Sequence, residues 1–161
     1  MQPLTFNDPS SLGVLVSRTA LASIAEEAVR SLGGNETGGV LLGHDLGQLV
    51  VHHAGAPGPK ADHHPDRFLR DLQYAQELAR AAWEEDRSQW IGEWHTHPNG
   101  VPEPSPTDLR SYLRHLHDPE LMLKRFLSVI VSVEEDNIRA VAWVIYPSAA
   151  YLVPLLVEEE E

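Results

Sequence analysis

The fold and the chemistry of this chain turn on residues 90–97, which read Trp-Ile-Gly-Glu-Trp-His-Thr-His. Three of the first five residues, Trp90, Ile91 and Trp94, are aromatic or β-branched, which favours a β-strand. Successive side chains of a strand point to opposite faces, so His95 and His97 would lie on the same face. The segment therefore predicts a strand that ends in two imidazoles facing one point.

A carboxylate follows the two histidines at the start of a predicted helix. Asp108 comes eleven residues after His97, within Ser-Pro-Thr-Asp at 105–108. Ser105 suits the N-cap, a proline suits the first helical position, and the helix dipole favours an acid in the first turn. Two histidines and one carboxylate, with a fourth position left to water, are the ligand set of a catalytic zinc site. We therefore expect Zn²⁺ as cofactor, bound by His95, His97 and Asp108.

These residues resemble the JAMM (MPN+, or JAB) metalloprotease motif, in which His-x-His is followed by seven residues, a serine, two more residues and an aspartate. The family also places a glutamate upstream, and Glu36 stands here within Glu-Thr-Gly-Gly-Val-Leu-Leu-Gly at 36–43. The similarity covers residues 12–146 and is closest to compact prokaryotic members, which typically carry Gly-(Asp/Glu)-Trp-His-Thr-His-Pro. The resemblance implies the MPN domain, a deaminase-like α-β-α sandwich.

The resemblance also implies which residues carry the reaction. Glu36 is the expected general base. Ser105 is expected to donate to the developing oxyanion as well as to cap its helix. Glu93 is the alternative base, because it lies two residues before His95 and would share the face of both ligands. His63 and His64 lie in a loop that could approach the cleft, although a solvated loop is the plainer interpretation.

Three functions remain open. The first is a zinc-dependent peptidase or isopeptidase, similar to a deubiquitinase, that cuts after the C-terminal tail of a ubiquitin-like protein or its conjugates. Only the resemblance implies this substrate, together with E1-like and E2-like operon partners. The second is a zinc hydrolase of another peptide or of a sulfur-carrier protein. The third is a non-catalytic MPN scaffold, which would not need an intact set of catalytic residues: Glu36, His95, His97, Ser105 and Asp108.

Composition limits the class of protein. A chain of 161 residues with 42% apolar side chains suits one globular domain, which we place at 1–157, followed by an acidic tail at 158–161. The absence of cysteine excludes disulfides and suits a reducing compartment, so we expect a cytoplasmic protein. We expect neither a secretory signal nor a membrane span. The net charge of -12 argues against non-specific binding of nucleic acid.

The spacing of apolar residues predicts the secondary structure. Helices are expected at 17–32, 71–87 and 106–117, and strands at 12–16, 40–42, 49–51, 90–94, 126–133, 138–146 and 151–157. Turn residues predict a hairpin at 44–47, a surface loop at 54–66 and a turn at 134–137. This mixed order favours an α/β sheet flanked by helices, partly antiparallel, over a doubly wound parallel sheet.

Overall fold

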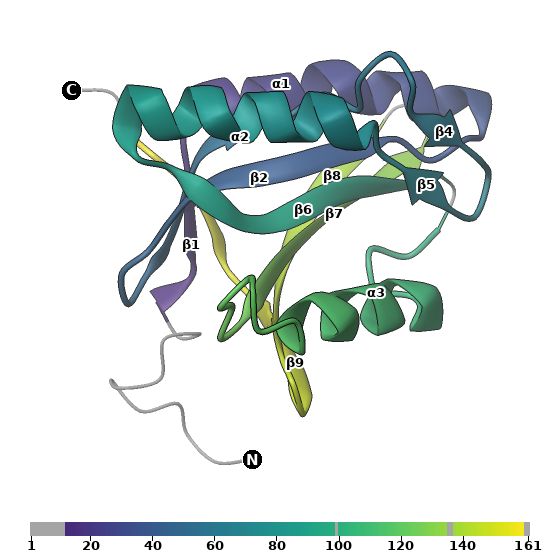
Figure 1. Cartoon of the computed structure of the whole chain (residues 1–161). Coiled ribbons are helices and arrows are strands. Elements are labelled where there is room, and N and C mark those ends of the chain that lie inside the picture. Colours follow the sequence, from purple (N-terminus) through teal and green to yellow (C-terminus); the bar gives the residue numbers. More distant parts are fainter. Residues whose placement is uncertain (1–11, 99, 135–136, 160–161) are drawn as a thin grey trace.

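The computed structural model describes residues 12–98, 100–134 and 137–159. Over these residues the protein is an α-β-α sandwich (Figure 1). Its eight-stranded sheet has the order β10-β1-β3-β2-β6-β7-β8-β9 and mixes parallel with antiparallel pairs. One helix, α1, covers one face, whereas α2 and α3 pack on the other. The predicted fold class, a sandwich around a mixed and partly antiparallel sheet, is confirmed.

The strands follow the prediction closely, with two differences. They are β1 Val14–Val16, β2 Gly38–Asp45, β3 Leu49–Ala54, β6 Gln89–Pro98, β7 Phe126–Glu134, β8 Asn137–Tyr146, β9 Ala149–Val153 and β10 Leu155–Val157. The single strand expected at 151–157 is divided at Pro154, which has no N–H to donate to a ladder. The surface loop expected at 54–66 contains part of a small hairpin, β4 Asp62–His63 with β5 Phe68–Leu69, so that prediction was partly wrong.

The helices begin at side-chain caps. Helix α1, Arg18–Ala28, has Ser17 as N-cap and continues as the 3-10 helix η2, Val29–Gly33. Helix α2, Leu72–Asp86, begins after Asp71, whose side chain accepts from the backbone N–H of Tyr74. Helix α3, Pro106–Leu116, begins after Ser105. Each satisfied cap replaces a hydrogen bond that the first turn of a helix lacks.

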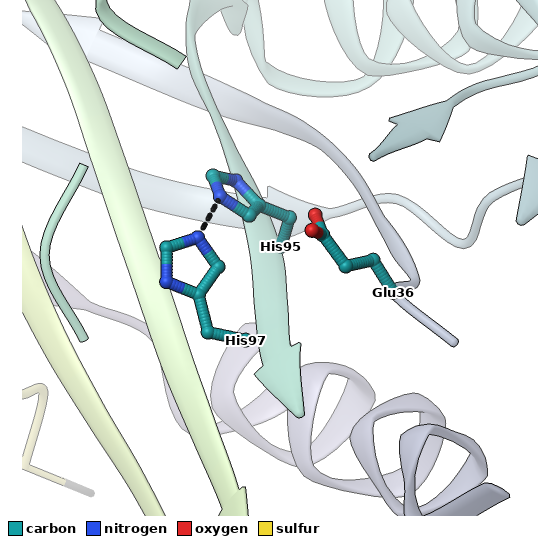
Figure 2. Close-up of side chains that lie close together, drawn as sticks. All are labelled: Glu36, His95 and His97. Carbon is teal, nitrogen blue, oxygen red and sulfur yellow. Dashed lines mark hydrogen bonds between the residues drawn. The ribbon is translucent and has the colours of Figure 1, made fainter. Parts of the chain in front are cut away.

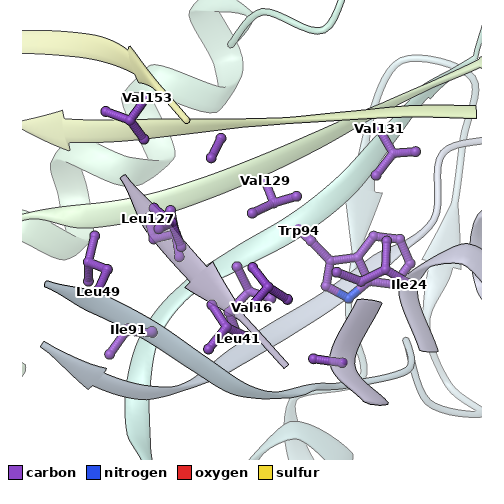
Figure 3. Close-up of a cluster of buried hydrophobic side chains, with 14 of the residues drawn as sticks. Val16, Ile24, Leu41, Leu49, Ile91, Trp94, Leu127, Val129, Val131 and Val153 are labelled. Carbon is purple, nitrogen blue, oxygen red and sulfur yellow. The ribbon is translucent and has the colours of Figure 1, made fainter. Parts of the chain in front are cut away.

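The main core lies between α1 and the sheet, and it decides which way the β6 side chains face. Ile24 of α1 packs with Trp94 of β6 and Val129 of β7 (Figure 3). Trp94 is only 1% exposed, and its indole N–H donates to the carbonyl oxygen of Gly55 over 2.9 Å. Because side chains alternate along a strand, the residues on either side of Trp94 must face α2 and α3. The predicted site residues of β6 lie on that face.

Some sequence predictions fall outside the described residues. The N-terminal segment 1–11, residues 135–136 of the predicted turn and residues 160–161 of the predicted acidic tail lie there. Within the described residues, the backbone N–H of Glu158 donates to the carbonyl oxygen of Val16, over 2.8 Å. None of the helices in this part of the chain is long and apolar enough to cross a membrane.

Candidate metal centre

The two histidines of the motif lie at the end of β6, on the face toward α2 and α3. His95 is only 4% exposed. The Nδ1 atom of His97 lies 2.9 Å from the carbonyl oxygen of Val101. A carbonyl oxygen only accepts, so Nδ1 carries the proton in this hydrogen bond, and Nε2 of a neutral His97 keeps a lone pair. A ring held in this way is prepared to bind a cation through Nε2.

Asp108 is held in place by the start of α3. Its backbone N–H donates to Ser105 Oγ over 3.0 Å, and its carboxylate Oδ2 accepts from the Ser105 backbone N–H over 2.9 Å. This reciprocal capping box, with Pro106 at the first helical position, is what residues 105–108 predict. The cap therefore fixes the Asp108 carboxylate as well as the helix.

The three predicted ligands meet at one point. The Nε2 atoms of His95 and His97 are 3.0 Å apart, and they lie 3.1 Å and 3.2 Å from Asp108 Oδ2. Four ligands at bonds of about 2.0–2.1 Å around tetrahedral zinc would be roughly 3.3–3.4 Å apart. The three donor atoms thus have nearly the spacing of one face of such a tetrahedron. The residues present fit a tetrahedral metal ion with a fourth position open.

Glu36 reaches the histidines because β2 pairs with β6. Gly38, at the start of β2, lies opposite His95 in an antiparallel register. A Cβ atom at Gly38 would collide with the Trp94 carbonyl oxygen and lie 2.9 Å from His95 Cα, so glycine permits this close approach. A carboxylate oxygen of Glu36 and one ring nitrogen of each histidine lie within 4.8 Å of one another. Figure 2 shows the Glu36 carboxylate directed toward the imidazoles from the neighbouring segment.

The charges around this point favour a cation. Burial raises the pKa of Glu36 to about 7, although His95 and His97 oppose the shift. Burial alone would lower the pKa of His95, but its hydrogen bond to Asp108 and the nearby carboxylates outweigh it, and the pKa rises. Burial would raise the pKa of Asp108, whereas hydrogen bonds from both histidines hold it well below its usual range. Several carboxylates thus surround two imidazoles. A bound cation would relieve the repulsion between the negatively charged carboxylates.

Glu93, the alternative base, lies on the predicted face but is paired with a cation. Its Oε2 atom accepts from Arg70 Nη1 over 3.0 Å, and the two side chains are 18% and 20% exposed. Burial raises the pKa of Glu93, although His95 and Arg70 oppose the shift. The Arg70 guanidinium also lies 5.5 Å from the centre of the Trp90 ring. Glu93 is therefore engaged in an ion pair beside the centre.

The small hairpin, β4 with β5, reaches Glu36, so the approach of His63 and His64 to the site holds rather than the solvated loop that was the plainer interpretation. The backbone N–H of Glu36 donates to the carbonyl oxygen of His64 over 2.8 Å, and the His63 imidazole donates to the carbonyl oxygen of Glu36 over 2.9 Å. The only sequence signal was the adjacent pair of histidines. A pocket of about 660 Å³ lies away from this place, at the other end of β6, where Trp90 and Met122 contribute to its lining.

Comparison with known proteins shows the family to which this chain belongs. The family of prokaryotic homologues of the JAB domain matches residues 17–146. A protein of Enterobacter hormaechei subsp. hoffmannii named CD-NTase/cGAS isopeptidase is 30% identical over 115 residues, which are 69% of this chain and 63% of that protein. The match therefore spans less than two thirds of that relative.

Two further similarities extend the comparison. A probable metalloprotease of Sinorhizobium fredii, y4qB, is 31% identical over 114 residues, 68% of this chain and 70% of that protein. The solution structure of protein DSY2949 from Desulfitobacterium hafniense superimposes with a TM-score of 0.69 at 20% identity, covering 91% of this chain and 94% of that one. At this identity the structure supports the fold alone.

Proposed function

Because this chain belongs to the family of prokaryotic homologues of the JAB domain, we propose that it is a metal-dependent peptidase or isopeptidase. The observation that carries the proposal is the meeting of His95, His97 and Asp108, whose donor atoms lie 3.0–3.2 Å from one another. Glu36 stands within reach of the two histidines, from the segment that precedes β2. A scaffold without catalysis would not need this arrangement.

The metal we propose is zinc, held by Nε2 of both histidines and Oδ2 of Asp108. A zinc ion in such a site lowers the pKa of a water from about 15.7 toward about 7 and polarises a substrate carbonyl. The chain supplies the rest of the arrangement. Its capping box keeps Asp108 in place, and the Val101 carbonyl oxygen orients the His97 ring.

Glu36 is the general base of this proposal. Its carboxylate would take a proton from the attacking water and then deliver it to the leaving amine. A carboxylate that stands beside both histidines is placed for both transfers. Glu93 is less suited, because Arg70 already binds its carboxylate.

Ser105 is the proposed donor to the oxyanion. Its Oγ atom accepts from the Asp108 backbone N–H. A hydroxyl both accepts and donates, so its proton remains available to stabilise negative charge on the carbonyl oxygen of the scissile bond. Ser105 would therefore cap α3 and bind the transition state with the same side chain.

For the substrate, we propose the C-terminal tail of a ubiquitin-like protein joined to another amine. The name of a relative that shares 30% identity over the matched residues, CD-NTase/cGAS isopeptidase, supports an isopeptide bond as the target. The ubiquitin-like tail is what the resemblance to the JAMM family implies. An isopeptide bond at a protein C-terminus is an amide, and hydrolysis of an amide needs the base, the oxyanion donor and the metal ligands proposed above.

The test is cleavage of ubiquitin-like proteins fused through their terminal glycine to a reporter. The wild-type protein should cut directly after the glycine, and a chelator should abolish the cleavage. Glu36→Gln should keep the fold and the metal but lose about 10²–10⁴-fold in turnover, the usual value of general acid–base catalysis. Glu93→Gln, the matched control, should keep most of the turnover.

Two outcomes would change the proposal. If Glu93→Gln abolished cleavage and Glu36→Gln did not, the roles of the two carboxylates would have to be exchanged. If none of the ubiquitin-like fusions were cut while unrelated peptides were hydrolysed in a metal-dependent way, the substrate would be a different peptide or a sulfur-carrier protein.

A further inference from the structure

The peptide backbone of Glu36 is held from outside the main sheet. We call residues 62–69, which form β4 and β5, the small hairpin. The His64 carbonyl oxygen accepts from the Glu36 N–H over 2.8 Å, and the His63 Nδ1–H donates to the Glu36 carbonyl oxygen over 2.9 Å. In Figure 1 the small hairpin lies beside the end of β6, where the two metal-centre histidines are. Both polar groups of the Glu36 backbone are therefore bound by this hairpin.

The neighbours of Glu36 are anchored to other parts of the fold. The Asn35 carbonyl oxygen accepts from Ser31 Oγ over 2.8 Å. The Thr37 backbone N–H donates to Thr96 Oγ1 over 2.9 Å, and its carbonyl oxygen accepts from the Thr96 N–H over 2.8 Å. The ladder between β2 and β6 begins only at Gly38. The peptide units before and after Glu36 are thus held from two sides, by Ser31 and Thr96 of the main fold and by the small hairpin.

We propose that His63 is a positioning residue that holds Glu36 in its catalytic place. The inference rests on the proposed function, in which Glu36 is the general base. The Nδ1–H of His63 binds the Glu36 carbonyl oxygen and, together with Thr96 on the Thr37 N–H, holds the peptide unit that sets the direction of the Glu36 side chain. His63 itself acts on neither substrate nor metal.

The two adjacent histidines have different tasks. The His63 ring packs on Phe68, with ring centres 5.4 Å apart, and reaches inward to Glu36. The His64 ring instead lies 2.9 Å from the Asp62 carboxylate, and only its backbone carbonyl contacts Glu36. The His64 N–H donates to the Arg67 carbonyl oxygen over 3.0 Å, which closes the hairpin. Removal of the His64 side chain would therefore leave the contact with Glu36 intact.

The effect on catalysis follows from geometry. Proton transfer requires heavy atoms about 2.6–3.2 Å apart, so a base that shifts slightly loses its function. A misplacement of about 1 Å can cost on the order of 10²-fold in rate. Loss of the His63 hydrogen bond would loosen the Glu36 peptide without removing the carboxylate.

The experiment compares three variants, with His64→Ala as the matched control. His63→Ala should lose about 10- to 100-fold in kcat while its KM stays close to that of the wild type. His63→Asn should recover most of the rate, because the amide N–H of asparagine can donate from nearly the position of Nδ1. His64→Ala should keep the kcat of the wild type. The bound metal should be equal in all three.

A second measurement does not depend on activity. Hydrogen exchange of the Glu36 backbone amide, which donates to the His64 carbonyl, should be faster in His63→Ala than in the wild type and unchanged in His64→Ala. This result would support the positioning role even if the proposed substrate were wrong.

Four results would overturn the inference. These are a wild-type kcat in His63→Ala, a raised KM with unchanged kcat, an equal loss in His64→Ala, and unchanged amide exchange. A raised KM would make His63 a substrate contact. A wild-type protein that cleaves none of the substrates would count against the proposed function, and the exchange measurement would still decide the role of His63.

Discussion

Ser105 caps α3 and is also the proposed donor to the oxyanion, and measurements of stability and of turnover can distinguish the two roles. Its backbone N–H donates to the Asp108 carboxylate, and its Oγ atom accepts from the Asp108 backbone N–H. These contacts stabilise the first turn of α3 and hold a proposed metal ligand. The proton of the same hydroxyl is the proposed donor to the oxyanion. The sequence predicted the cap, and the resemblance to the JAMM family implied the oxyanion donor. The serine itself could not separate the two roles, because serine is favoured at an N-cap for its own sake.

Ser105→Ala should reduce both stability and turnover. Loss of the cap should cost about 1 kcal/mol in the free energy of unfolding, and loss of the oxyanion donor should reduce kcat by about 10²–10³-fold. Ser105→Thr keeps a hydroxyl and a capping oxygen, so its free energy of unfolding and its kcat should stay close to those of the wild type. Urea denaturation and steady-state kinetics measure the two effects. A normal kcat in Ser105→Ala would leave Ser105 with the cap alone.

At the scale of elements, the pairing of β2 with β6 brings Glu36 to the histidines. This pairing needs glycine at position 38, where a Cβ atom would meet the backbone of Trp94 and His95. Glycine at position 38 permits a close approach of two backbones, and the structure has one there. Which backbone it approaches follows from the register of the sheet, which no local pattern specifies.

Gly38→Ala should push β2 away from β6 at the site. Overpacking of this kind typically costs about 1–3 kcal/mol in the free energy of unfolding, and the displaced Glu36 should lower turnover as well. Gly33→Ala is the matched control, since a Cβ atom at Gly33 would meet nothing within 4 Å. Its stability should change by less than about 0.5 kcal/mol. Equal stabilities of the two variants, measured by urea denaturation, would contradict the close approach.

Some elements could be predicted from the sequence, whereas the small hairpin could not. Alternation along 90–97 placed Glu93, His95 and His97 on one face, and capping chemistry placed the start of α3 at residues 105–106. The small hairpin was missed because each of its strands has two residues, too few for any alternation. Its contact with Glu36 depends on the path of a loop, and a loop path is not set by periodicity.

At the scale of the whole molecule, the site joins parts that are distant in sequence. Glu36 precedes β2, the two histidines end β6, and Asp108 begins α3. Glu36 meets the two histidines because β6 lies next to β2 in the sheet. Along the chain, β3, the small hairpin and α2 separate β2 from β6. Spacing alone predicted that the histidines and Asp108 converge, whereas the place of Glu36 came from the resemblance to the JAMM family.

The measurement that tests the central claim most directly is the metal content of the purified protein. We predict one equivalent of zinc in the wild type and loss of that zinc in a His95→Ala/His97→Ala double variant. The matched control is His44→Ala/His52→Ala, which removes another pair of adjoining imidazoles, 3.1 Å apart, on β2 and β3. This control should keep the full equivalent of zinc. Equal zinc in the wild type and in the His95→Ala/His97→Ala variant would contradict the proposed centre.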